Sequence, residues 1–155
     1  MAERPDNELT IAELKFWRRF MEGMGAFDGA LNRQLQADSG ISHLEFGVLV
    51  SLDEVRRGRR MSDLAQRLSI SPSRLTHLVG RLEDRGWVER CPSADDRRAT
   101  LAVLTDEGES VMREAWSGHA RLLRSILIDE IDPEERATLE RIFRGLARRA
   151  NEAYR

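Results

Sequence analysis

The chain has 155 residues, of which 41% are hydrophobic and 34% are charged, and this composition predicts one water-soluble, helix-rich domain. No apolar run approaches the roughly 18–20 residues of a membrane span, and the polar start MAERPDNELT does not fit a secretory signal. Cys91 is the only cysteine, which excludes an internal disulfide, and we expect a cytoplasmic protein. The three histidines lie far apart, without HExxH or CxxC spacing, so we expect no metal site and no cofactor.

Two capping boxes mark the first predicted helices. Thr10 followed by Glu13 predicts a helix start, and an apolar stripe carries this helix to about Leu35. Glycines inside the helix weaken it and predict a local bend. Ser42 followed by Glu45 predicts the start of a second, shorter helix.

The next two predicted helices are joined by a very short link. Residues 63–68 form a short helix for which Ser62 is the predicted N-cap. After three residues, Ser71 caps a second helix over residues 72–85, and Gly86 ends it in the left-handed conformation. Two helices joined in this way form a helix-turn-helix, in which the second is the recognition helix.

After Gly86 the apolar pattern changes to a period of two. This pattern predicts β-strands at residues 87–90 and 99–104, separated by the polar turn of residues 92–98. The turn contains adjacent arginines, so the predicted β-hairpin has a basic tip. A hairpin in this position makes the motif a winged helix-turn-helix.

Two further helices follow the hairpin. Residues 105–108 begin a long helix with acids in its first turn, and Pro133 begins the last one. The terminal helices carry broad apolar faces, which a winged domain of about 65 residues could not cover. We expect these helices to pack against the same helices of a second chain, although an intramolecular bundle on the winged domain would also bury them.

The charges are distributed unevenly along the chain. The total net charge is −2, but residues 56–98 contain eleven arginines and six acids, a local charge of +5 that leaves −7 elsewhere. A basic middle between acidic flanks indicates a local nucleic-acid surface, although a solvated charged surface is the plainer interpretation.

These patterns together predict a mainly α (α+β) fold. Within a single domain of residues 1–155, residues 41–105 form the winged helix-turn-helix lobe, and residues 8–37 and 106–155 supply the dimerisation helices. The expected function is binding of a pseudo-palindromic DNA operator by a homodimer, and the alternative is a winged-helix module that binds a protein partner. No Ser/His/Asp arrangement, phosphate loop or carboxylate pair stands out, so we expect no enzyme.

The most specific stretch resembles a known family. The segment LEDRGWVER at residues 82–90, the DRR triplet at residues 96–98 and LTDEG at residues 104–108 resemble the MarR family of bacterial transcriptional regulators. MSDLA at residues 61–65 resembles the family's helix before the recognition helix, and the likeness extends over almost the whole chain. It implies an obligate homodimer, usually a repressor, that is often released by a small phenolic or other aromatic ligand.

The resemblance also implies which residues contact double-stranded DNA. The recognition helix would lie in the major groove, and the wing arginines would enter the minor groove. The implied residues are Ser71, Ser73, Arg74, Thr76, His77 and Arg81 on the helix, with Asp96, Arg97 and Arg98 on the wing. Physical chemistry agrees, since helix N-termini bind phosphate, arginine pairs with guanine, and a narrow minor groove attracts arginine. A phosphate or intrahelical contact for Arg81 and a turn cap for Asp96 remain open alternatives.

An effector site is the remaining expectation. In this family effectors bind where the dimer helices meet the winged domain. The expected contacts there are Trp17, His43, Phe46, Met112 and Trp116, although aromatic residues at helical spacing are more often core. Some similar proteins sense peroxide through a cysteine on the first helix. Cys91 lies instead at the end of the first wing strand, and this position argues against the same redox role.

Overall fold

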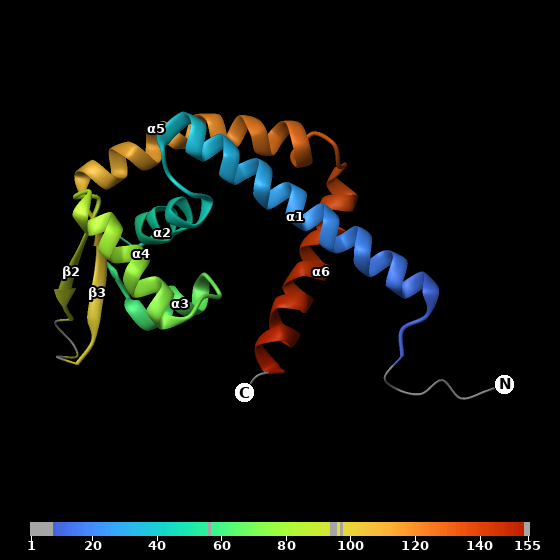
Figure 1. Cartoon of the computed structure of the whole chain (residues 1–155), viewed down its shortest axis with the longest axis horizontal. Coiled ribbons are helices and arrows are strands. Elements are labelled where there is room, and N and C mark those ends of the chain that lie inside the picture. Colours follow the sequence, from blue (N-terminus) through green and yellow to red (C-terminus); the bar gives the residue numbers. More distant parts are fainter. Residues whose placement is uncertain (1–7, 56, 94–95, 97, 154–155) are drawn as a thin grey trace. The chain divides into compact units, whose positions relative to one another are not determined.

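The computed structural model describes residues 8–55, 57–93, 96 and 98–153, and it shows a mainly helical fold with one small sheet (Figure 1). The elements in chain order are α1 (Ile11–Ser39), α2 (His43–Asp53), β1 (Arg59–Arg60), α3 (Met61–Arg67), α4 (Pro72–Asp84), β2 (Val88–Pro92), β3 (Thr100–Leu104), α5 (Asp106–Leu123), the π-helix η1 (Arg124–Ile128) and α6 (Pro133–Glu152). These residues form two compact units that divide between His119 and Ala120. None of the helices described is both long enough and apolar enough to cross a membrane.

Local capping residues begin the first two helices as predicted. At the start of α1, the Thr10 backbone N–H donates to the Glu13 carboxylate at 2.6 Å, and the Glu13 N–H donates back to the Thr10 hydroxyl. The helix continues through its glycines beyond the predicted end and stops at Gly40, whose φ of 64° is left-handed. Ser42 and Glu45 form the second capping box, at the start of α2.

The start of α3 differs from the prediction. Ser62 is not the N-cap, because α3 begins at Met61, and the hydroxyl of Ser62 donates to Asp63 inside the first turn at 3.1 Å. The preceding residues explain the difference. Arg59 and Arg60 form β1, and their pairing with β3 fixes the chain in an extended conformation up to the residue before the helix.

The hairpin of β2 and β3 is confirmed, and β1 completes a three-stranded antiparallel sheet in the order β1-β3-β2. The two long strands pair from Val88 opposite Leu104 to Pro92 opposite Thr100. We call β2, β3 and the turn between them the wing. β1 was not predicted because two adjacent arginines carry no alternating apolar pattern.

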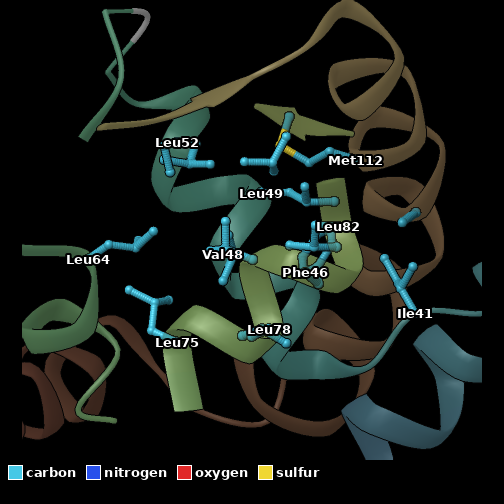
Figure 2. Packing of buried hydrophobic residues seen from close by; sticks show 14 of the residues in the cluster. Ile41, Phe46, Val48, Leu49, Leu52, Leu64, Leu75, Leu78, Leu82 and Met112 are labelled. Carbon is cyan, nitrogen blue, oxygen red and sulfur yellow. The ribbon is translucent and has the colours of Figure 1, made fainter. Parts of the chain in front are cut away.

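The core of the first unit is built around α2. Six positions of α2 are buried, and Val48 and Leu49 are completely inaccessible to solvent. Figure 2 shows α2 within a cluster that includes Leu64 of α3, Leu75 of α4 and Met112 of α5. This packing fixes α4, and therefore its opposite face, relative to the rest of the lobe.

The wing is joined to α4 and α5 by a close backbone contact. The carbonyl oxygen of Trp87 accepts the N–H of Thr105, and the Thr105 hydroxyl donates to the carbonyl of Gly86 at 2.7 Å. Gly108 in the first turn of α5 comes so near that an added Cβ would lie 2.1 Å from the Trp87 oxygen. A glycine is therefore required there for the first turn of α5 to lie against the chain that leads into the wing.

The second unit contains η1 and α6. The π-helix was not predicted, since its residues continue an apolar stripe that reads as ordinary helix. α6 begins at Pro133 as predicted, with Asp132 as an N-cap that accepts the N–H groups of Glu134 and Glu135, both at 2.8 Å.

Candidate nucleic-acid interface

α4 has one buried and one polar face. Leu75, Leu78, Val79 and Leu82 are buried, whereas the six residues predicted to contact DNA on this helix are all exposed. Ser71 is the N-cap as predicted, because its hydroxyl accepts the N–H of Arg74 at 3.3 Å. The structure therefore brings Ser71, Ser73, Arg74, Thr76, His77 and Arg81 to one exposed helix.

Two clefts flank this polar face. The first has a volume of about 620 Å³ and lies between α4, the middle of α1 and the start of α2. Its walls include Arg74, His77 and Arg81 from α4 and Asp28 from α1. The second has a volume of about 350 Å³ and lies between α4, the start of α3 and the wing. Its lining includes Arg60, Ser62, Thr76, Arg90, Arg98 and Thr100.

Sequence reasoning missed Arg60 and Arg90 as members of this surface. Arg60 was counted only in the regional charge, because β1 was not predicted, and Arg90 only as part of a strand. In the structure Arg90 donates through Nε to Glu83 of α4 at 2.7 Å, and its backbone N–H also donates to Glu83. This pair joins the wing to α4. The separation of the two residues, across the end of a helix and Gly86, gave no signal in the sequence.

Arg81 makes a contact that is neither intrahelical nor fully open to solvent. Its Nε and Nη2 both donate to Oε1 of Glu45 on α2, each at 3.3 Å. Burial alone would raise the pKa of Glu45, but hydrogen bonds from Ser42 and the charge and hydrogen bonds of Arg81 lower it below its ordinary value. Glu45 is therefore a charged, buried partner of an exposed arginine.

Asp96 bonds to the backbone of Arg98 in the wing turn. One of its carboxylate oxygens accepts the backbone N–H of Arg98 at 3.0 Å, and the other lies 3.5 Å from the guanidinium of Arg60. The Asp96 contact is thus the turn cap that the sequence left open, and it acts on the main chain of Arg98. Arg98 is exposed at this turn, while Arg97 lies outside the described residues.

The predicted ligand residues lie in two places. The rings of Phe46, Trp116 and His119 form a cluster with His43, in which the Phe46–His119 centroid distance is 4.7 Å and the His43–His119 distance is 5.8 Å. Met112, on the same helix as Trp116 and His119, is also buried. We call His43, Phe46, Trp116 and His119 the ring cluster.

Trp17 stands apart from the ring cluster along α1. It stacks on Phe20, with ring centroids 6.1 Å apart. His43 forms a hydrogen bond of 2.7 Å with Asp28, which lies eleven residues after Trp17 on α1. Because an α-helix rises about 1.5 Å per residue, Trp17 and Asp28 are about 16 Å apart along the helix.

His119 is the unusual member of the ring cluster. It is only 5% exposed, and its Nδ1 is a buried atom for which the described part of the chain offers no hydrogen-bond partner. Burial lowers the pKa of His119 below its ordinary value, and the charge of the neighbouring His43 lowers it further. The cluster therefore combines apolar rings with one unsatisfied polar atom.

Comparisons with known proteins agree on one family. The sequence profile of the MarR family matches residues 39–99. The transcriptional repressor MprA of Escherichia coli K12 is 31% identical over 122 residues, which cover 78% of this chain and 68% of MprA. Sco3205, a MarR family transcriptional regulator from Streptomyces coelicolor solved in complex with DNA, is 40% identical to this chain. The two structures superpose with a TM-score of 0.87 over 94% of this chain and 91% of Sco3205. CouR from Rhodococcus jostii RHA1, bound to p-coumaroyl-CoA, is 25% identical with a TM-score of 0.76, over 83% and 89% of the two chains.

The lowered pKa of His119 predicts a pH dependence of stability. As the pH falls from about 7 to about 5, the unfolded chain takes up a proton near the ordinary pKa of 6.5, while the folded chain resists it. The stability that neutral His119 contributes to the folded chain is fully present above pH 6.5 and is lost as the pH falls through the lowered folded-state pKa. The difference in free energy of unfolding between the wild type and His119→Gln, measured in urea, should therefore shrink toward pH 5. A difference that stays constant or grows would contradict the assignment.

Proposed function

Because the chain belongs to the MarR family of DNA-binding transcriptional regulators, we propose that it is a homodimeric repressor that reads a specific site in double-stranded DNA. The family consists of regulators, and the protein is not an enzyme. The repressor role is proposed because the relative MprA is a transcriptional repressor. The DNA partner is proposed because the structure of Sco3205 contains DNA. The dimer, the operator symmetry and the ligand are the finer parts of this proposal, and each has its own support.

The observation that carries the proposal is the polar face of α4 between two clefts. One cleft is lined by Arg74 and Arg81, and the other by Arg60, Arg90 and Arg98, so cations stand on both sides of the helix. Cations on both flanks of an exposed helix fit the phosphates that border a major groove. A neutral protein partner would leave these charges without partners of opposite sign.

The proposal gives each part of this surface a role. The start of α4 would bind phosphate through its N–H groups and hydroxyls, and the middle would reach base edges in the major groove. The helix residues are Ser71, Ser73, Arg74, Thr76, His77 and Arg81. Arg98 would enter the minor groove, with Asp96 holding its backbone, and Arg97 is proposed for the same groove from the sequence alone.

The homodimer is supported by apolar faces that each unit leaves open. On α1 the side chains of Ile11, Phe16 and Trp17 are exposed by 75%, 69% and 50%. In the second unit, Ile142 and Leu146 of α6 are exposed by 47% and 42%. Exposed apolar side chains gathered on a helix are normally covered by a partner, and the same helices of a second copy would cover each of these faces symmetrically. Two recognition helices would then read half-sites about one helical turn apart.

The ring cluster supports release by a small aromatic ligand. Phe46 and Met112 are buried apolar side chains beside the half-exposed Trp116, and His43 and His119 supply polar atoms, a combination typical of sites for planar ligands. CouR shows that a relative accepts an aromatic acyl thioester. Trp17 belongs to the proposed dimer face rather than to this site.

The experiment that tests the function is selection of duplexes from random DNA by the purified protein at moderate salt. Enrichment of an inverted repeat with half-sites about ten base pairs apart would support a dimeric sequence reader. No enrichment above the level of non-specific binding would refute the proposal and favour a winged module for an acidic protein partner.

Arg98→Ala should weaken binding to the selected duplex by about tenfold or more, because the residue is exposed on the wing and would lose its groove contact. Its free energy of unfolding should change by less than about 0.5 kcal/mol, since the side chain is exposed. Affinity can be measured by fluorescence anisotropy. Arg144→Ala, which removes the same charge from α6, is the control and should leave affinity unchanged. Equal affinity of both variants would contradict the proposed role of the wing.

Ile142→Asp combined with Leu146→Asp should convert the dimer into a monomer of 17.8 kDa, because both changes bury charge in the proposed interface. Mass can be measured by light scattering after size-exclusion chromatography. Ala137→Asp adds a charge on the opposite side of α6 and should leave the dimer intact. A double variant that remains dimeric would show that α6 is not part of the interface.

A further inference from the structure

The contact between Arg81 and Glu45 joins an exposed cation to a buried acid. The Arg81 side chain is 60% exposed, and that of Glu45 is 7% exposed. Two N–H groups of its guanidinium, on Nε and Nη2, donate to the same carboxylate oxygen of Glu45. The remaining N–H groups of Arg81 are available to a phosphate or a base edge. Glu45 thus binds one edge of the guanidinium and leaves the other N–H groups available for a second contact.

Glu45 is itself fixed in place. Its other carboxylate oxygen accepts the backbone N–H of Ser42 at 2.8 Å and the Ser42 hydroxyl at 2.7 Å. These bonds form the capping box of α2, and the neighbouring Phe46, Val48 and Leu49 anchor that helix in the core. The position of the Glu45 carboxylate is therefore fixed by α2, and it determines the conformation in which the Arg81 side chain can bind it.

We propose that Glu45 is a positioning residue that fixes the guanidinium of Arg81 for DNA contact, and so raises sequence discrimination without touching DNA. The inference rests on the proposed function, because it needs α4 to be the recognition helix. An arginine side chain loses rotamer freedom when it binds, and a contact formed during folding removes part of that cost. It also sets the plane of the guanidinium, on which two-point recognition of a guanine depends.

The sign of the expected effect separates positioning from plain electrostatics. A carboxylate near a DNA-binding helix repels phosphate, so loss of its charge alone would strengthen binding to any duplex. Loss of positioning would instead lower the affinity for the selected duplex relative to a scrambled one. The ratio of the two affinities therefore reports on positioning.

The test uses the full chain and two probes, the duplex selected from random DNA and a scrambled duplex of equal length and composition. Glu45→Gln keeps the size of the side chain and an acceptor for the capping box, but removes the charge that holds Arg81. The affinity ratio should fall about threefold to tenfold, while affinity for the scrambled duplex stays equal or rises. Glu54→Gln is the matched control, since Glu54 pairs with Arg67 at 2.6 Å in the same lobe, and it should leave the ratio unchanged.

A double-mutant cycle distinguishes positioning from a general structural role. Arg81→Ala should lower the ratio, and adding Glu45→Gln to Arg81→Ala should lower it no further, because Glu45 acts only through that arginine. An equal loss from Glu45→Gln in both backgrounds would overturn the proposal. Thermal unfolding of each variant shows whether it is folded at the temperature of the assay.

A measurement on the wild type keeps the proposal testable if Glu45→Gln does not fold. In the DNA-free protein, the Nε–H group of Arg81 should show the restricted motion of an ordered side chain in NMR relaxation experiments. A freely mobile Nε–H group would overturn the proposal.

The failure of this inference can be told apart from the failure of the proposed function. Wild type that does not distinguish the two duplexes would refute the function, and the inference with it. Wild type that distinguishes them, together with a Glu45→Gln variant that keeps the full ratio, would overturn the inference alone.

Discussion

The burial of α2 is the constraint on which the rest of the first unit depends. Val48 and Leu49 are inaccessible to solvent and lie in the same cluster as Leu75 and Leu82 of α4. Because this apolar packing holds one side of α4 in the core, the opposite side must face outward, and it carries the hydroxyls and arginines. The helix-turn-helix presents a polar face as a consequence of where its apolar residues are buried, and no separate interaction is needed to orient it.

The wing is held by polar and backbone contacts where the core ends. Glu83, near the end of α4, accepts hydrogen bonds from both the side chain and the backbone N–H of Arg90. The Thr105 hydroxyl donates to the carbonyl of Gly86. These contacts place the second cleft between α4 and the wing, with Arg60 brought to it by the pairing of β1 with β3. The exposed face of α4 and the wing, which would reach neighbouring grooves, are therefore joined by hydrogen bonds where β2 begins and where β3 ends.

The first turn of α2 belongs to both proposed sites. His43 lies in the ring cluster and is bonded to Asp28 of α1, while Glu45, two residues later, holds Arg81 of α4. A ligand that displaced His43 would act on the same turn that fixes Arg81. In the proposed repressor, the first turn of α2 would therefore connect the ligand site to the DNA-binding face of α4.

The sequence by itself determined the features that depend on neighbouring residues. The capping boxes at Thr10 and Ser42, the N-cap at Ser71 with Pro72, and the stop at Gly86 all involve atoms a few residues apart, so the helix order, the hairpin and the exposed face of α4 could be predicted. Tertiary structure alone decided the features that join distant segments. β1 forms only because β3 offers it a partner, and this pairing moved the start of α3 away from Ser62. The contact of Arg81 with Glu45 spans 36 residues, and Trp17 lies away from the ring cluster because of its height along α1. Side-chain contacts of this range depend on how helices pack in three dimensions, and a pattern read along one chain does not contain that information.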